Sequence, residues 1–226
     1  KSILLDEGYL TDLRTAIAGA IATKYLSNVH SSSVGIIGAG IQAKLQLKAI
    51  MLVRKIKKAT IWARDIYKAN NFKNDLNDLN IEVTVSNSCK ELAKNSEIIV
   101  TTTPSKKPLL YYDWIKKGCH ITAMGSDAEQ KNELDPKMIK LSDKYIPDNQ
   151  SQTCVLGELN HAIQKNIISS NTKFDDLGDV IMNPKLGRNK KDDITICDLT
   201  GTGVQDTAIA RYAYNLCKKN NLGLTI

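Results

Sequence analysis

Short apolar runs alternate with longer amphipathic segments along most of this 226-residue chain. A short apolar run is typical of a strand buried on both faces, whereas apolar residues spaced three and four apart indicate a helix that covers such strands. This alternation predicts an α/β fold with a mostly parallel, doubly wound sheet. The expected strands are 34–37, 59–63, 81–85, 97–101, 120–124, 144–148 and 194–199.

The helices expected between these strands follow from apolar spacing and from local start and stop signals. Thr11 is the predicted N-cap of the first helix. Segment 178–191 is rich in Gly, Pro, Asn and Lys, which predicts a loop. The other expected helices are one after residue 43 with Leu45, Ala49, Leu52 and Val53 on its apolar side, 66–79, 89–95, one beginning at 133–136, 157–165, and 206–218.

A glycine-rich turn of the form G-x-G-x-x-A follows the first apolar run and precedes a helix. In a Rossmann-type fold the first glycine makes the tight turn, the second lets the backbone approach a pyrophosphate, and the small residue allows close packing of helix on strand. The helix N-terminus adds unpaired N–H groups and the positive end of a dipole. The turn therefore predicts a dinucleotide cofactor site, with contacts from Gly38, Gly40, Ile41 and Gln42.

Arg14 and Thr15 fall in the predicted first turn of the N-terminal helix. A cation at that end opposes the helix dipole unless an anion is bound nearby. The Arg14 guanidinium, the Thr15 hydroxyl and the helix end would together bind a carboxylate or a phosphate. An arginine that simply faces solvent also explains this position.

The end of the second expected strand decides which dinucleotide the fold prefers. An acidic residue there would bond the ribose of NAD, but Ala63 occupies the position and Arg64 and Asp65 follow. Arg64 suits the 2′-phosphate of NADP, while Asp65 could still reach a ribose hydroxyl. The cofactor is therefore NAD or NADP, and Arg64 favours NADP.

Asp127 is the strongest candidate for proton transfer. It follows strand 120–124, whose end at Met124 would lie beside the nicotinamide, and Gly125 permits close backbone approach. A carboxylate there could exchange a proton with a substrate amine or a water molecule. Alternatively, Asp127 caps a helix over 129–134.

Two other strand ends add candidates to the same edge of the sheet. Thr103 and Pro104 follow strand 97–101, where the cofactor crevice is expected. Thr200 opens the turn Thr200–Gly203 after the last strand. That turn is either a second site of close backbone approach or a plain connection.

Composition excludes several classes of function. The net charge is +7, but the lysines occur in pairs at element ends, aromatic residues make up 5% of the chain, and no recognition motif accompanies them, so no nucleic-acid partner is expected. No apolar run approaches the roughly 18 residues of a membrane span. The five cysteines are scattered without a C-x-x-C pair and the three histidines lack ligand spacing, which favours reduced thiols in a cytoplasmic protein without a metal site.

Several stretches together resemble the ornithine cyclodeaminase and μ-crystallin family. They occur in the family's order and span essentially the whole chain. The matching stretches are LTDLRTAIAGAIATKYLS (10–27), VGIIGAGIQAKLQL (34–47), TTTPS (101–105), GCHITAMGSDAEQKNELDP (118–136), GELNHAI (157–163) and DITICDLTGTGVQDTAIA (193–210).

The resemblance implies a domain organisation and an assembly. It places a Rossmann-type NAD(P)-binding domain at residues 31–192. Remnants of a second, substrate and dimerisation domain lie at both chain ends: an N-terminal helix in 1–30, and a return strand and helix in 193–226. Members of this family are homodimers. They also have roughly a hundred residues before the first of these helices, so the chain is expected to be a fragment or a truncated form.

The resemblance also implies roles for individual residues. Arg14 corresponds to the family arginine that binds cofactor and substrate carboxylate, with Thr15 beside it, and Asp127 to the catalytic proton carrier. Lys131 would lie near the nucleotide and Thr200 where the family closes over nicotinamide and substrate. Thr103 and Met124 complete the predicted cofactor contacts.

The expected activity is that of an NAD(P)-dependent cyclodeaminase, which converts an L-amino acid to a cyclic imino acid and releases ammonia. The alternatives are an NADPH-dependent reductase of cyclic ketimines, an alanine dehydrogenase-like oxidoreductase, or a nicotinamide-binding protein without turnover. The small-molecule partner is accordingly an amino acid or a cyclic imine.

Overall fold

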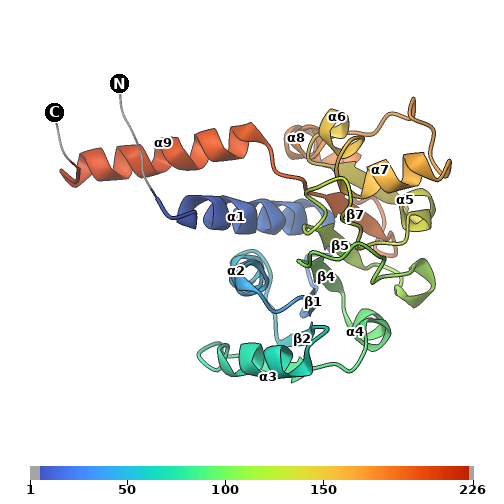
Figure 1. Ribbon diagram of the computed structural model, residues 1–226, viewed down its shortest axis with the longest axis horizontal. Helices are drawn as coiled ribbons and strands as arrows, with labels where there is room; N and C mark the ends of the chain where they lie inside the picture. The colour runs from blue at the N-terminus through green and yellow to red at the C-terminus, as the bar shows by residue number, and fades with distance from the viewer. Residues whose placement is uncertain (1–5, 224–226) are drawn as a thin grey trace.

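A computed structural model describes residues 6–223. Its strands form a seven-stranded sheet in the order β3-β2-β1-β4-β5-β7-β6, and every neighbouring pair is parallel (Figure 1). The predicted α/β, doubly wound, Rossmann-type fold is therefore confirmed. The strands are β1 (Ser33–Ile37), β2 (Lys58–Trp62), β3 (Glu82–Val85), β4 (Ile98–Thr101), β5 (His120–Ala123), β6 (Lys144–Pro147) and β7 (Thr195–Asp198).

Helices cover both faces of the sheet (Figure 1). On one side α1, α2 and α3 lie against the strands, and on the other α4, α5 and α7 do. The helices are α1 (Tyr9–Leu26), α2 (Ile41–Met51), α3 (Ile66–Asn74), α4 (Cys89–Asn95), α5 (Lys137–Leu141), α6 (Gln150–Thr153), α7 (Gly157–Gln164), α8 (Leu177–Met182) and α9 (Gly203–Lys219), with 3-10 turns η1 (Tyr112–Trp114) and η2 (Pro184–Leu186).

The alternation of side chains along β1 shows how the two layers divide the core. Ile36 packs with Leu47 of α2 on one face of the sheet, while Ile37 packs with Leu92 of α4 on the other. Successive residues of a strand point to opposite faces, so a continuous apolar run feeds both layers. This is why a strand buried on both sides appears in the sequence as an unbroken run.

Strand order reverses at β1. From β1 the chain continues through β2 and β3 on one side, and then returns to β4 on the other side of β1. In open parallel sheets a crevice forms at such a switch point, outside the carboxyl ends of the strands. The glycine turn at the end of β1 and the loop after β4 therefore meet there.

Several helices begin or end at residues other than those predicted. Leu52, placed on the apolar side of the helix after the glycine turn, lies beyond the end of α2 and is exposed. Helix α3 ends at Asn74 and not at 79, and α9 begins at Gly203 and not at 206. The predicted loop 178–191 contains α8 and η2, because Leu177 and Val180 are buried against α1 and stabilise a short helix there.

Helix α1 begins at Tyr9 after a left-handed Gly8, so Thr11 is not its N-cap. The helix packs closely on α2, where Gly19 faces Gln46: a Cβ on this glycine would lie 2.0 Å from the Gln46 side-chain oxygen. The absence of a side chain at that position allows the two helices to approach. Helix α1 is thereby fixed beside the cofactor crevice.

Buried Arg54 holds the other end of α1. Its guanidinium donates hydrogen bonds to the carbonyl oxygens of Thr23 and Lys24 at 3.0 and 2.8 Å and to the Ser27 hydroxyl at 2.8 Å. The last carbonyls of a helix have no partner within the helix, so these bonds satisfy them. Arg54 follows α2 in the chain and thus ties the two helices together.

The chain ends were predicted to belong to a second domain. Residues 1–5 and 224–226 of those segments lie outside the described residues. Strand β7, assigned to the return segment, is hydrogen-bonded between β5 and β6 inside the sheet. Helix α9 runs beside α1 and has no buried residue (Figure 1). The division into domains stays a prediction. Among residues 6–223, no helix is both long enough and apolar enough to cross a membrane.

We expect Arg54→Ala to lower the free energy of unfolding by about 2–4 kcal/mol, because several buried carbonyl oxygens lose their donor. Urea unfolding followed by circular dichroism would measure the change. Lys55→Ala is the matched control, since Lys55 is the exposed neighbour. Equal stability of the two variants would show that Arg54 does not anchor α1.

Candidate functional site

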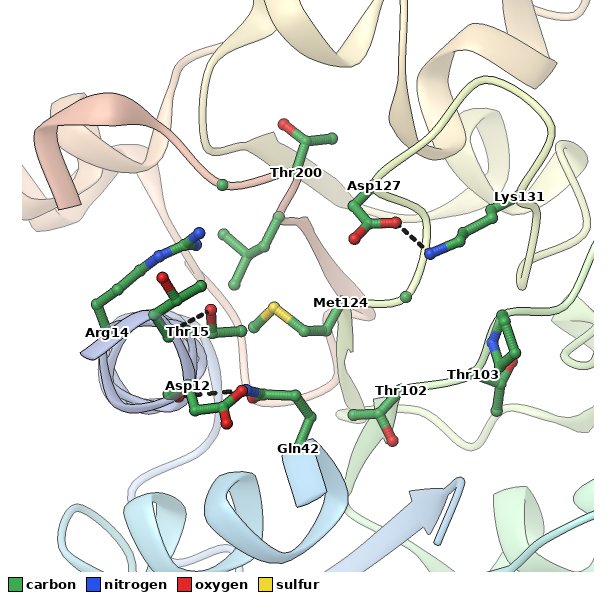
Figure 2. A pocket seen from close by; sticks show the side chains of 15 residues that line it. Asp12, Arg14, Thr15, Gln42, Thr102, Thr103, Met124, Asp127, Lys131 and Thr200 are labelled. Atoms are coloured by element: carbon green, nitrogen blue, oxygen red, sulfur yellow. Dashed lines mark hydrogen bonds and ion pairs between the residues drawn. The ribbon is translucent and has the colours of Figure 1, made fainter. Parts of the chain in front are cut away.

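A cavity of about 360 Å³ opens at the carboxyl edge of the sheet, beside the switch point (Figure 2). Its walls come from α1, the start of α2 and the loops that follow β4, β5 and β7. The lining residues are Thr11, Asp12, Arg14, Thr15, Gln42, Thr102, Thr103, Pro104, Met124, Gly125, Asp127, Lys131, Leu199, Thr200 and Gly201.

The cavity brings together eight of the predicted site residues, which come from five separate segments of the chain. They are Arg14, Thr15, Gln42, Thr103, Met124, Asp127, Lys131 and Thr200. The remaining predicted residues, Gly38, Gly40, Ile41 and Arg64, are not among the lining residues.

The glycine turn has the geometry that a pyrophosphate needs. Gly38 has φ 127°, and a Cβ there would lie 2.4 Å from the Thr102 hydroxyl, so only glycine fits. At Gly40 an added Cβ would meet nothing within 4 Å, so space is open at the N-terminus of α2. No side chain caps that N-terminus. Its free N–H groups and open approach fit the phosphates of a dinucleotide cofactor.

Asp127 and Lys131 form an ion pair at the cavity, with 2.5 Å between Lys131 Nζ and Asp127 Oδ1 (Figure 2). The alternative that Asp127 caps a helix over 129–134 is wrong, because this segment is a loop and the next helix, α5, begins at Lys137. The Asp127 carboxylate therefore does not accept hydrogen bonds from the N–H groups at the start of a helix. It points to the cavity, where a ligand could reach it.

Helix α7 fixes the loop that contains this ion pair. His161 Nε2 lies 2.6 Å from the Lys131 carbonyl oxygen. Buried Glu158 accepts hydrogen bonds from the backbone N–H groups of Glu133 and Leu134 and from the Asn132 side chain. These contacts were not predicted, because α7 has four polar residues, Glu158, Asn160, His161 and Gln164, and their spacing does not indicate which of them bonds the loop.

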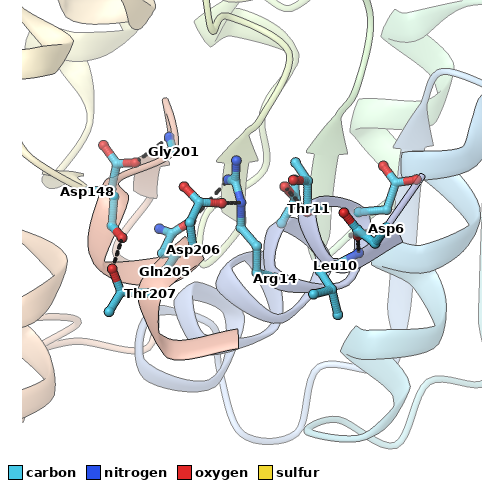
Figure 3. Close-up of polar contacts among 12 residues, drawn as sticks. Asp6, Leu10, Thr11, Arg14, Asp148, Gly201, Gln205, Asp206 and Thr207 are labelled. Carbon is cyan, nitrogen blue, oxygen red and sulfur yellow. Dashed lines mark hydrogen bonds and ion pairs between the residues drawn. The ribbon is translucent and has the colours of Figure 1, made fainter. Parts of the chain in front are cut away.

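Arg14 lies in the second turn of α1 and not in the first, because the helix begins at Tyr9. Its side chain crosses to α9, where Nε donates to Asp206 at 2.9 Å and Nη1 to Gln205 at 3.2 Å (Figure 3). Gly201 leaves room for the guanidinium, since a Cβ there would lie 2.8 Å from Nη1. The guanidinium therefore lines the cavity with N–H groups left for an anion.

The Thr15 hydroxyl donates to the carbonyl oxygen of Thr11 within α1, at 2.7 Å. Its proton is thus used inside the helix, and its oxygen can still accept a bond from a ligand.

The turn after β7 is held by a carboxylate beneath it. Asp148 accepts hydrogen bonds from the backbone N–H group of Thr200 at 2.9 Å and from that of Gly201 at 2.7 Å (Figure 3). The Thr200 hydroxyl donates to Asp148 and accepts from the Gln152 side chain. Thr200 therefore lines the cavity with its hydroxyl proton already used, so its direct role toward a ligand is that of an acceptor.

Arg64 lies in an exposed position after β2. The neighbouring Asp65 is the N-cap of α3, and its carboxylate accepts hydrogen bonds from the N–H groups of Tyr67 and Lys68. Oδ1 of this carboxylate is thus engaged in capping. None of the ion pairs found within residues 6–223 involves Arg64.

Comparison with known proteins places this geometry in a family. The chain matches the ornithine cyclodeaminase/mu-crystallin family over residues 2–221. An uncharacterized cyclodeaminase of Sinorhizobium fredii is 49% identical over 224 residues, which are 99% of this chain and 68% of the relative.

Two solved structures are similar along almost the whole chain. An archaeal alanine dehydrogenase dimer with bound NAD has a TM-score of 0.91 at 37% identity, covering 96% of this chain and 67% of that one. The Thermococcus litoralis Delta(1)-pyrroline-2-carboxylate reductase, in complex with NADH and L-proline, has a TM-score of 0.91 at 28% identity, covering 96% and 68%. The chain thus spans about two thirds of the length of these proteins.

Asp198, directly before the cavity wall at Leu199, gives a pH prediction. Burial raises the pKa of this carboxyl to about 7, against about 3.9 in an unfolded chain. The folded protein therefore keeps a proton that the unfolded chain releases. The stability contributed by Asp198 falls as pH rises between about 4 and 7, by at most about 1.4 kcal/mol per pH unit.

Asp198→Asn keeps an oxygen for the hydrogen bonds from Tyr145 and from the backbone of Glu158 and Leu159. We expect this variant to lose that part of the pH dependence in urea unfolding at pH 5 and pH 7. Asp192→Asn, at an exposed position, is the control. An unchanged slope in Asp198→Asn would contradict the raised pKa.

Proposed function

The chain belongs to the ornithine cyclodeaminase/mu-crystallin family, as its sequence motifs predict, and from this premise we propose that it is an NAD(P)-dependent amino-acid cyclodeaminase. Such an enzyme converts an L-amino acid that has a side-chain amine to a cyclic imino acid and releases ammonia. The relative with the highest identity quoted above is a cyclodeaminase by name. The observation that supports the proposal most directly is the placement of Asp127 and Arg14 on one cavity beside the glycine turn.

The two ends of the cavity suit the two ends of an amino acid. Arg14 has N–H groups for the substrate carboxylate, and Asp206 and Gln205 hold its guanidinium in one orientation. Asp127 supplies a carboxylate for the amine end. Lys131 pairs with this carboxylate and fixes its direction.

The cofactor would lie along the carboxyl edge of the sheet. Gly38, Gly40, Ile41 and Gln42 would hold its pyrophosphate at the start of α2, and Thr103 and Met124 would border the nicotinamide. A bound nicotinamide supplies the hydride acceptor and donor. The two solved relatives described above contain NAD and NADH.

Asp127 would then move the protons of the reaction. It accepts a proton from the α-amine as the α-carbon is oxidised to an imine, and it returns a proton to the departing nitrogen. The side-chain amine takes the place of the α-nitrogen, and ammonia leaves. The α-carbon ends at its original oxidation level, so no reduced cofactor accumulates.

A second candidate activity is net reduction of a cyclic ketimine by NADPH. It is favoured by the exposed Arg64 after β2, together with the engagement of Asp65 as a helix cap. The Thermococcus litoralis relative is a reductase by name. In this reaction Asp127 would protonate the imine nitrogen while the carbon is reduced. An oxidoreductase acting like alanine dehydrogenase, and a nicotinamide-binding protein without turnover, are the remaining alternatives.

The first test incubates the full-length protein with L-ornithine and a catalytic amount of NAD and measures ammonia and proline. We expect proline without accumulation of NADH. NADPH consumption with pyrroline-2-carboxylate, and no product from ornithine, would instead support the reductase. Retention of NADPH without turnover of any tested substrate would support the binding protein.

In the same assay, we expect Asp127→Asn to lower kcat by about 10²–10⁴-fold, the usual contribution of a positioned acid or base, with cofactor affinity nearly unchanged. Glu129→Gln removes an exposed carboxylate from the same loop outside the cavity lining, and should keep wild-type activity. Turnover of Asp127→Asn equal to that of Glu129→Gln would remove Asp127 from the mechanism.

Cofactor choice is tested by Arg64→Ser. If Arg64 binds the 2′-phosphate, the Kd of NADPH should rise on the order of tenfold, as expected for loss of one charge-assisted contact, while the Kd of NADH stays the same. Fluorescence titration measures both. Lys55→Ser, which removes a positive charge before β2 at the opposite edge, should change neither value. Equal effects of Arg64→Ser on both dinucleotides would contradict the preference for NADP.

A further inference from the structure

Glu133 is a fully buried carboxylate behind the cavity wall. Oε2 accepts hydrogen bonds from the Thr101 hydroxyl at 2.6 Å and the Gly125 N–H at 2.8 Å. Oε1 accepts from the N–H and the hydroxyl of Thr103, both at 2.6 Å. The loops after β4 and β5, which both line the cavity, are thus joined through one carboxylate.

Little separates this carboxylate from the cavity. Gly125 lines the cavity, and a Cβ on it would lie 2.5 Å from Glu133 Oε2. Gly125 and Thr103 therefore line the cavity and bond this carboxylate at the same time. Asp148 has a similar position beneath the opposite wall, where it accepts hydrogen bonds from the N–H groups of Thr200 and Gly201.

The hydrogen bonds of Glu133 match its ionised form. An ionised carboxylate only accepts, and all four partners of Glu133 are donors, two of them backbone N–H groups that cannot reverse. Burial raises the pKa of this carboxyl, and these four bonds oppose the rise. The charge is therefore held by dipoles and not by a counter-ion.

No cationic side chain within residues 6–223 pairs with that charge. Within residues 6–223 none of the ion pairs includes Glu133 or Asp148. The charged side chains that line the cavity balance one another: Arg14 and Lys131 are cations, and Asp12 and Asp127 are anions. The carboxylates of Glu133 and Asp148, each surrounded by hydrogen-bond donors, therefore add negative charge behind the walls, which a cationic ligand in the cavity would balance.

We propose that Glu133, aided by Asp148, makes this cavity prefer the oxidised form of the nicotinamide cofactor over the reduced form. This inference rests on the proposed function, because it takes the cavity to hold the nicotinamide. The oxidised ring is a cation and the reduced ring is neutral, so a buried negative charge behind Gly125 and Thr103 stabilises the first selectively. Glu133 acts through the field and through the loops, and it does not touch the reacting atoms.

The test compares Glu133→Gln with Thr101→Val in the full-length protein. Both variants remove a hydrogen bond from the same network, but only Glu133→Gln removes the charge. Isothermal titration would give Kd values for NAD⁺, NADH, NADP⁺ and NADPH, and thermal unfolding would measure the loss of stability. The ratio of oxidised to reduced Kd is independent of any loss of affinity that the two forms share.

In Glu133→Gln we expect the Kd of the oxidised form to rise on the order of tenfold more than that of the reduced form, because the lost charge attracts the cationic ring and not the neutral one. In Thr101→Val the two Kd values should change by the same factor. An unchanged ratio in Glu133→Gln would overturn the inference and leave Glu133 as a structural residue.

Asp148→Asn provides a second test if Glu133→Gln does not fold. The ratio of the oxidised to the reduced Kd should change in the same direction in this variant, and an unchanged ratio would overturn the inference equally. The proposed function fails separately: if the wild-type protein binds none of the four dinucleotides, the cofactor site itself is wrong. Binding by the wild type with no change of ratio in the variants refutes only the role of the buried charge.

Discussion

The cavity depends on one constraint, that backbone N–H groups buried at the ends of parallel strands must find acceptors. Beyond β4, β5 and β7 the chain leaves the sheet ladder while still inside the protein, and each loop has N–H groups without a strand partner. An unpaired buried N–H costs about 1–3 kcal/mol. Glu133, Glu158 and Asp148 accept bonds from these groups. The loops that line the cavity are therefore shaped by acceptors behind them.

The same carboxylates connect the structural and the chemical roles of the site. Glu158 on α7 holds the backbone at Glu133, and Glu133 in turn holds the loops at Thr103 and Gly125. Asp127, two residues beyond Gly125, takes its position from this arrangement. On the facing wall, α9 orients Arg14 through Asp206. Preorganised groups of this kind need little rearrangement when a ligand binds.

The sequence was sufficient for the fold because the features that specify it are local. Unbroken apolar runs marked the strands, and the spacing around Gly38 and Gly40 marked the crevice. The eight predicted residues that meet at the cavity were found from their places at strand ends and from the family resemblance. The start of α1 was missed because its N-cap is Gly8 in a left-handed conformation, and the carboxylate that accepts from the Leu10 N–H belongs to Asp6, two residues before that cap.

The buried carboxylates could not be predicted, because their partners are distant in the chain: Glu133 bonds residues 8 to 32 positions away, and Glu158 bonds residues 24 to 26 away. A sequence pattern shows that a residue is acidic but not which N–H groups it will meet. Helix α8 was missed for a similar reason, since Leu177 and Val180 are stabilised by α1 and not by their own neighbours.

The order of the strands also has a consequence for how the protein is made. Among the strands of residues 6–223, β6 pairs only with β7, and β7 lies between β5 and β6 although it is the last of them in sequence. During synthesis β1 to β5 can pair as they emerge, but β6 has no neighbour until residues 195–198 appear. The pairing of β7 with both of its neighbours is therefore non-local, and such pairings are intrinsically slow to form. The wall of the cavity at Leu199–Gly201 follows β7 directly, so it takes its place only when that strand is paired.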